Sequence, residues 1–500
     1  MRRPPEDRAI VPFPTHAVSN MEWVPTGITA KQKLAERLIA EECAQQAKRH
    51  GMSRAQFLRT AAATATAFMV LNKLHGSEAF AVKKVHCDDL DAARELLDKK
   101  VFVMDVQQHH VDLNLFPDGA GCFLRFRDRM AAGGCPASVG QANFVKEVFV
   151  DSETDVGVIS GLPYGGVPLG PAAMIETRDL VNELAGASAG AERCLAQAVC
   201  DPTNEYPNTR VEDMEGQVQR GARALKCYTY SGNWRLDDNY SDPDYRAAAA
   251  TATSPFRPVG ASVAYPMLQE AERLGLRLVN IHKGLPATFA PGSEETVRAT
   301  DFPKVVHDFP KLSFCAYHSA YFGSNDDHPK GKAGLDNWEW LEVLASIPKK
   351  ERKRVYSEIG STFAIMLAGG PDMAAHFIGK LLKALGPKNV LWGTDSIWWG
   401  SPQWLIDAFK TLTIPEQMQE QFGYPALTEK TKKRILGLNS ARLYGVKPKA
   451  DRCTLSSNQL AVWQGEQGGS REGRALMAHG PTTRREFFAL MRREQRSQMG

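Results

Sequence analysis

Three histidines and one aspartate each stand at the end of a short apolar run in this sequence. They are His109, His282, His318 and Asp395, and the runs before them have the length and composition of buried strands. Imidazole and carboxylate groups bind divalent metal ions, and imidazole also transfers protons near neutral pH. A (β/α)8 barrel carries its catalytic residues at the carboxyl ends of its parallel strands. The four residues therefore predict a metal-dependent active site at one mouth of such a barrel.

The stretch from 83 to 446 alternates between strand and helix patterns, as a barrel requires. Mixed apolar runs predict eight strands, at 101–106, 155–160, 195–200, 222–227, 277–282, 312–317, 354–358 and 389–394. Helical patterns lie between most of them, at 174–186, 266–274, 302–308, 335–345 and 373–385. Eight units favour a closed barrel over a doubly wound sheet. A doubly wound nucleotide-binding fold would also need a glycine-rich turn after its first strand, and none lies between Asp105 and His110.

The fold class predicted is therefore an α/β (β/α)8 (TIM) barrel over 83–446, with further segments at both ends. Residues 1–50 form an N-terminal extension with a charged helical stretch from 30 to 49, and 51–82 form a signal-like apolar segment. Residues 447–500 are polar and basic, with arginine pairs at 484–485 and 492–493, and predict a flexible tail. The long polar stretch 228–258 follows the fourth strand, where loops often determine the substrate.

The apolar segment admits two interpretations. A basic patch at 52–59, an apolar run at 60–71 and a small-residue site at 79–81 stand in the order of a secretory signal. Residues 53–59 also resemble the twin-arginine pattern, with Ala55 in place of the second arginine. The segment begins some fifty residues into the chain, which instead favours an arm packed on the enzyme. Localisation is left open, with the cytoplasm slightly favoured over export.

Composition excludes several classes of partner. The 500 residues are 43% hydrophobic and 24% charged, which is ordinary for a globular protein. A net charge of +4 gives no argument for nucleic-acid binding, and no apolar run reaches the roughly 18 residues of a membrane span. The nine cysteines are scattered without paired spacing, as expected for reduced thiols. We expect a small-molecule substrate as the partner, and assembly into a homo-oligomer is left open.

Several short motifs resemble those of a known family. The first strand reads Asp105-Val-Gln107-Gln-His109, where the family usually has Asp-x-His-x-His. Later strands end in Ile281-His282-Lys-Gly284, His318-Ser319 and Gly393-Thr394-Asp395, and the closing helix runs from 433 to 445. Over about 100–446 the chain resembles the amidohydrolase-related family of metal-dependent hydrolases. That family includes aminocarboxymuconate-semialdehyde decarboxylase, resorcylate decarboxylases and lactone hydrolases.

The resemblance implies one divalent metal ion, most simply Zn²⁺, held by His109, His282 and Asp395. It also implies that His318 is a general acid or base, with Asp395 moving protons beside it. Gln107 stands where the family has its first histidine ligand, and an amide oxygen is a poorer ligand for zinc than imidazole. We expect Gln107 to lie at the metal and to weaken its binding. His110 could replace it if the end of the strand twists, but in a regular strand His109 and His110 cannot both point inward, because neighbouring residues face opposite sides.

Four further residues are candidates for substrate binding: Lys226, Glu358, Tyr317 and Trp398. Lys226 would pair with a substrate carboxylate, bridge two metals as a carboxylated lysine, or be an ordinary lysine without a role. Glu358 would orient a ligand or bind substrate. The two aromatic residues would form walls for a flat substrate, although core packing explains them equally well.

Three functions follow from this reading of the sequence. The first is a metal-dependent hydrolase acting on an ester, lactone or amide bond. The second is a metal-dependent, non-oxidative decarboxylase of a small aromatic or unsaturated acid, in which His318 governs protonation of the carbon. The third is a non-catalytic barrel used as a binding protein, which Gln107 favours.

Overall fold

The structure of the chain is a computed structural model. It describes residues 11–17, 27–115, 139–163, 168–187, 189–203, 206–231, 234–237, 264–285, 294–322, 335–336, 338–448, 459–460 and 462. Most of the loop at 228–258 and most of the tail at 447–500 therefore lie outside the described residues, as does the predicted flexibility of that tail.

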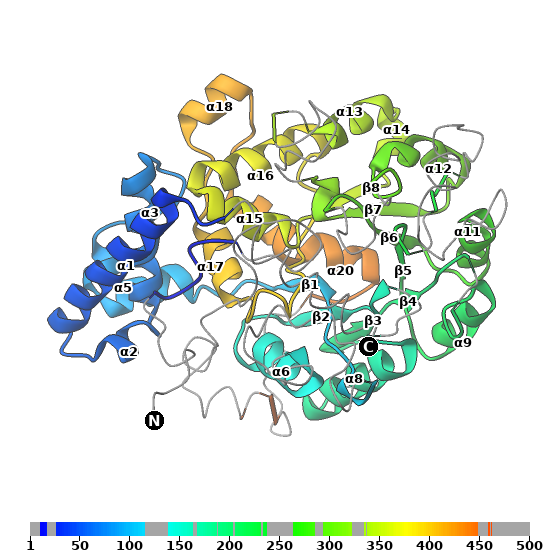
Figure 1. The fold of residues 1–500 in the computed structure, drawn as a ribbon, viewed down its shortest axis with the longest axis horizontal. Helices are drawn as coiled ribbons and strands as arrows, with labels where there is room; N and C mark the ends of the chain where they lie inside the picture. Colours follow the sequence, from blue (N-terminus) through cyan, green and yellow to red (C-terminus); the bar gives the residue numbers. More distant parts are fainter. Residues whose placement is uncertain are drawn as a thin grey trace, which may run out of the picture.

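Parallel strands form a closed barrel with eight strand positions (Figure 1). The strands are β1 Met104–Gln108, β2 Val156–Ile159, β3 Cys194–Ala196, β4 Ala198–Val199, β5 Leu225–Tyr228, β6 Leu278–His282, β7 Ser313–Tyr317, β8 Val355–Glu358 and β9 Val390–Leu391. Gln197 alone separates β3 from β4, so the two fill one position. Each strand pairs in parallel with the next, and Gln108 pairs with Ser396 just beyond β9 to close the ring. The predicted (β/α)8 barrel is confirmed.

Helices cover the outside of the barrel between successive strands, and four more follow the last strand, of which α20 packs against β1 and β9 at the centre (Figure 1). They are α6 Gln141–Val145, α8 Pro171–Leu184, α9 Met214–Gln219, α11 Ala264–Arg273, α12 Phe302–Asp308, α13 Glu339–Ser346, α14 Lys349–Arg352, α15 Thr362–Gly369, α16 Pro371–Leu385, α17 Gln403–Thr411, α18 Glu416–Phe422, α19 Glu429–Lys433 and α20 Asn439–Tyr444. The sequence pattern located α12 to the residue, whereas α13 begins four residues later than predicted.

Two apolar layers enclose the strands, because alternate side chains of each strand face opposite sides. Val103, Val279 and Val355 pack outward against the helices, and Met104, Val158 and Leu391 fill the barrel interior. A polar chain crosses this interior. Tyr444 of α20 contacts Asn280, Asn280 contacts Gln197, and Gln197 contacts the Tyr317 hydroxyl, with separations of 3.0, 2.9 and 2.9 Å.

The N-terminal residues form a helical layer against one side of the barrel, drawn in blue in Figure 1. Its helices are α1 Ala30–Arg49, α2 Arg54–Phe57, α3 Ala61–His75, α4 Val85–Asp88 and α5 Leu90–Leu97. The predicted helix over 30–49 is confirmed. Thr29 begins it, because its hydroxyl accepts the Gln32 N–H in a capping box.

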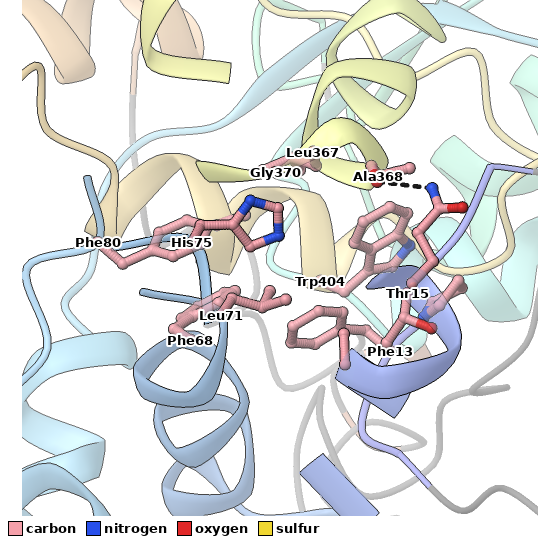
Figure 2. Close-up of a pocket in the computed structure, with 14 residues that line it drawn as sticks. Phe13, Thr15, Phe68, Leu71, His75, Phe80, Leu367, Ala368, Gly370 and Trp404 are labelled. Carbon is pink, nitrogen blue, oxygen red and sulfur yellow. Dashed lines mark hydrogen bonds between the residues drawn. The ribbon is translucent and has the colours of Figure 1, made fainter. Parts of the chain in front are cut away.

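Helix α3, within the signal-like segment, is part of the folded core. Phe68 stacks on Phe80 with ring centroids 4.3 Å apart, and Phe13 stacks on Trp404 of α17 (Figure 2). Phe80 also pairs with Leu412, and Gln32 donates to the Ala368 carbonyl at 2.8 Å. A cavity of about 20 Å³ remains among these residues, room for about one water. The export interpretation stays a prediction. Among the described residues, no helix has the length and apolar character of a membrane span.

We predict that Phe68→Ala will lower the free energy of unfolding by about 3 kcal/mol, since it removes a buried ring that joins α3 to the barrel. Val85→Ala is the control, because Val85 is 50% exposed and its loss should change stability by less than about 0.5 kcal/mol. Urea unfolding of both variants measures the difference. Equal stabilities would mean that the N-terminal layer does not support the barrel.

Candidate active site

The structure brings the four residues singled out in the sequence to one mouth of the barrel. His282 is the last residue of β6. His109 directly follows β1, His318 directly follows β7, and Asp395 lies in the turn after β9. The His109 Nε2 atom is 3.5 Å from Asp395 Oδ1, and His282 Nδ1 is 3.1 Å from His318 Nε2. All four side chains are buried.

Each of the three imidazoles turns one ring nitrogen to a main-chain carbonyl. His109 Nδ1 lies 2.9 Å from the Ser160 oxygen, His318 Nδ1 lies 2.9 Å from the Gly360 oxygen, and His282 Nε2 lies 3.3 Å from the Leu285 oxygen. A carbonyl only accepts, so a ring nitrogen that bonds to one carries the proton and leaves a lone pair on the inward nitrogen. The inward nitrogens of His282 and His318 are 3.1 Å apart, and one of them must keep a proton for the two to share a hydrogen bond. Histidines that bind metal ions are oriented in the same way.

Burial keeps these imidazoles neutral. Desolvation, together with the nearby Lys226 cation, lowers the pKa of His109 and of His318 to about 3. The same two causes, together with the neighbouring His318, hold the pKa of His282 well below its ordinary value. Burial raises the pKa of Asp395 to about 6, against the hydrogen bond from Ser361 and the charge of Lys226. Neutral imidazole is the form that binds a metal ion.

Gln107 lies inside this cluster. Its side-chain Nε2 donates to Asp395 Oδ1 at 3.0 Å and lies 3.2 Å from His318 Nε2. Simple alternation along β1 would place Asp105, Gln107 and His109 on one face, but β1 is irregular between Asp105 and Gln108. Asp105 instead accepts hydrogen bonds from the Thr394 N–H and hydroxyl. The Gln107 side chain reaches the cluster all the same.

His110 points away from the site. Its Nδ1 faces the Val111 carbonyl at 3.0 Å, and its Nε2 contacts the Thr177 hydroxyl on α8 at 2.8 Å. It therefore does not replace the histidine that Gln107 displaces.

The donor set fits a metal ion, provided that Gln107 moves. Within the described parts of the chain, no three His, Cys, Asp or Glu side chains are arranged to hold one ion as they stand. The Gln107 amide lies within the cluster, in contact with both Asp395 and His318. Its Oε1 atom is buried and has no hydrogen-bond partner among the described residues. Rotation of the amide would therefore present a buried oxygen, two imidazole nitrogens and a carboxylate to an ion.

Glu358 holds the turns that carry the site. Its carboxylate accepts the main-chain N–H groups of His318, at 3.1 Å, and of Gly360. Burial raises its pKa well above the ordinary value. These contacts favour the expectation that Glu358 orients other residues over the expectation that it binds substrate.

Strained backbone marks the same turns. His318, Ser361 and Asp395 have φ angles of 57°, 54° and 60°, in the left-handed region that residues other than glycine rarely adopt. Such strain persists only where the surrounding structure imposes it, and it is frequent at active sites. Here it aims three polar side chains at one centre.

Aromatic rings and one cation line the remaining sides of the cluster. The Lys226 ammonium is buried, 4.0 Å from the centre of the Tyr317 ring and 4.3 Å from that of Tyr228. Tyr317 lies deeper in the barrel, where its hydroxyl donates to the Val106 carbonyl at 2.7 Å, so it forms a floor rather than a wall. Trp398 stacks beside His109 with ring centroids 6.4 Å apart.

Ser361, Tyr230 and Trp399 also belong to the site, and of these the sequence indicated only Trp399, as an aromatic residue flanking Asp395. Ser361 donates to Asp395 Oδ2 at 2.5 Å, and Trp399 donates to Ser361 at 2.9 Å. Tyr230 meets His282 edge to face, with ring centroids 4.8 Å apart. The position of Ser361, just after the strand that Glu358 ends, was the available signal, since polar residues after strand ends identified the other members.

Sequence comparison identifies the family. A profile described as Amidohydrolase matches residues 174–446, more than half of the chain. The chain belongs to the amidohydrolase family of enzymes. The matched region contains His282, His318 and Asp395 but begins after Gln107 and His109. No significant match was found among curated protein sequences.

Three of the solved structures to which this chain is similar illustrate the range of the matches. A protein described as a probable 2-pyrone-4,6-dicarboxylic acid hydrolase, from Acinetobacter baumannii, has a TM-score of 0.41 and 13% identity over 69% of this chain and 99% of its own. The 5-carboxyvanillate decarboxylase from Sphingomonas paucimobilis has a TM-score of 0.41 and 14% identity over 69% of this chain and 100% of its own. An amidohydrolase from Burkholderia multivorans, with bound zinc, has a TM-score of 0.38 and 13% identity over 69% of this chain and 100% of its own. Likeness at this level does not carry a substrate or a metal over to this chain.

We predict that Gln107→His will tighten metal binding and leave the fold intact. The side chain already reaches Asp395 and His318, and imidazole is the stronger zinc ligand. Competition of each protein with a chromogenic zinc chelator measures the affinity. An affinity equal to or weaker than that of the wild type would show that Gln107 is not beside the ion.

Proposed function

We propose that the chain is a hydrolase that depends on one divalent metal ion, most simply Zn²⁺, and cleaves an ester, lactone or amide bond in a small substrate. The observation that supports this most is the orientation of the three imidazoles. In each ring, one nitrogen contacts a main-chain carbonyl oxygen, and the other nitrogen points toward the centre that Asp395 faces.

His109, His282 and Asp395 would hold the ion, with the Gln107 oxygen as a weaker fourth ligand. A divalent ion bound there lowers the pKa of a water to about 7 and polarises a carbonyl oxygen. Two imidazoles and one carboxylate with an open position are a common set for catalytic zinc.

Hydrolysis also requires that a water lose a proton and that the leaving group gain one. Asp395 suits the first task, because its Oδ1 oxygen faces the cluster and a carboxylate can accept a proton. His318 suits the second. Its Nδ1–H is held by the Gly360 carbonyl, so its neutral ring would accept on Nε2 the proton that the water loses, by way of Asp395, and would return it to the leaving group.

Lys226 would hold an anionic group of the substrate. Its ammonium is fully buried between two tyrosine rings and lies close enough to lower the pKa of three histidines of the site. A buried cation at the floor of a site is a binding point for a carboxylate. Trp398 and Tyr230 would then flank the body of a flat molecule.

The same cation favours a second candidate, non-oxidative decarboxylation of a small aromatic or unsaturated acid. Here the ion and Lys226 would hold the acid, and His318 would deliver the proton to the carbon that loses carbon dioxide. Release of carbon dioxide from candidate acids, against release of acid from esters and lactones, separates the two reactions.

We predict about one divalent ion per chain after reconstitution, measured by elemental analysis. His109→Ala and Asp395→Asn should each remove most of it, because each deletes one of three strong ligands. Wild-type protein that holds no metal after reconstitution would contradict both enzymatic proposals and support a barrel used only for binding.

We predict that His318→Asn will keep most of the metal and lower turnover by roughly 10²- to 10⁴-fold, the usual contribution of a general acid or base. Metal content and turnover of the same preparation are the two measurements. Loss of the metal would make His318 a ligand that replaces the missing first-strand histidine. Full activity would make it a packing residue.

A further inference from the structure

Ser361 lies where β8 turns into α15, and it connects two other residues of the site. Its Oγ atom donates to Asp395 Oδ2 at 2.5 Å and accepts from the Trp399 indole at 2.9 Å. All three side chains are nearly inaccessible to solvent. None of the roles discussed above uses Ser361 or Trp399.

The chemistry of the indole fixes the direction of this chain of hydrogen bonds. A tryptophan N–H only donates, so the serine oxygen must accept from it, and the single hydroxyl proton of Ser361 is left for Asp395. Oδ2 of the carboxylate is therefore occupied, and Oδ1 is the oxygen that faces Gln107 at 3.0 Å and His109 at 3.5 Å. The two oxygens of Asp395 are made different by residues outside the histidine cluster.

The surroundings argue against Ser361 as a nucleophile, although a strained serine after a strand can be one. A nucleophile needs free N–H groups beside it to bind the developing oxyanion. The N–H groups of Thr362 and Phe363 already donate to the carbonyls of Gly360 and Ile359, at 2.6 and 2.9 Å. The hydroxyl also points at a carboxylate rather than into open space.

We propose that Trp399 and Ser361 act in series as positioning residues that hold Asp395 with Oδ1 turned toward the imidazoles. The proposal rests on the function proposed above, because it concerns the orientation of the carboxylate used there. The strained φ angles of Ser361 and Asp395 are consistent with it, since two turns are held in a costly conformation to make one contact.

The chain offers a matched control. Trp340 of α13 donates to the hydroxyl of Ser357 on β8 at 2.7 Å, which is the same kind of bond, also buried, but packed between β8 and a helix. The probe reaction is hydrolysis of 4-nitrophenyl acetate by zinc-loaded enzyme. We expect Ser361→Ala to lower kcat about 10- to 100-fold, the loss for one hydrogen bond to a charged group, with KM changed less than about twofold. Ser357→Ala should change kcat less than about twofold.

A double-mutant cycle separates positioning from general loss of packing. Trp399→Phe alone should lower kcat, but in the Ser361→Ala background it should lower it no further, because Trp399 acts through Ser361. Additive losses would overturn the proposal, as would full activity of Ser361→Ala. An acyl adduct on Ser361, found by mass spectrometry, would overturn it in favour of a nucleophile.

A measurement that needs no activity keeps the two proposals distinguishable. The indole N–H resonance of Trp399, identified as the one missing in Trp399→Phe, should shift in Ser361→Ala and stay in place in Ser357→Ala. An inactive, metal-free wild type with this shift would contradict the proposed function and leave the Trp399–Ser361 contact in place. An unchanged resonance in Ser361→Ala would contradict the contact itself, whatever the activity.

Discussion

Closure of the barrel between β1 and the turn after β9 is the constraint on which the site depends. Asp105 accepts the Thr394 N–H at 3.1 Å and the Thr394 hydroxyl, and main-chain bonds join Gln107 to Asp395 and His109 to Ser396. These bonds bring Gln107 and His109, which lie near the first strand, into contact with Asp395, which follows the last strand. Burial raises the pKa of Asp105 to about 7, although four hydrogen bonds act to lower it. The contact between β1 and the turn after β9 thus depends on the Asp105 carboxyl, which is costly to ionise, and the hydrogen bonds to Asp105 offset that cost.

The elements around this contact support the same few side chains from outside. Helix α15 begins one residue after Ser361, and α17 begins four residues after Trp399. The N-terminal layer packs on both of these helices, through Gln32 on the last turn of α15 and Phe13 on Trp404 of α17. Glu358 holds the turns at His318 and Gly360. Strained backbone at the site is therefore stabilised by packing several contacts away.

Strand periodicity and polar residues at strand ends predicted the eight strands and brought His109, His282, His318 and Asp395 together, because barrel geometry follows from local patterns. The irregularity in β1 could not be predicted, since it depends on pairing with β2 and with the β9 turn. The sequence also did not predict that Gln107 bridges Asp395 and His318, or that Ser361 and Trp399 support Asp395. In each case the residues in contact lie far apart in the sequence. The contacts of Glu358 with the His318 and Gly360 N–H groups, and of Tyr317 with the Val106 carbonyl, could not be predicted either, because main-chain atoms carry no sequence signal.

The central claim is that His109, His282 and Asp395 hold one metal ion once the Gln107 amide has rotated. Crystals of zinc-reconstituted protein, with diffraction data above and below the zinc absorption edge, test it most directly. The account predicts one anomalous peak about 2.0–2.2 Å from His109 Nε2, a nitrogen of His282 and an Asp395 oxygen, with Gln107 rotated. A map with no peak there, and with Gln107 Nε2 still donating to Asp395, would contradict it.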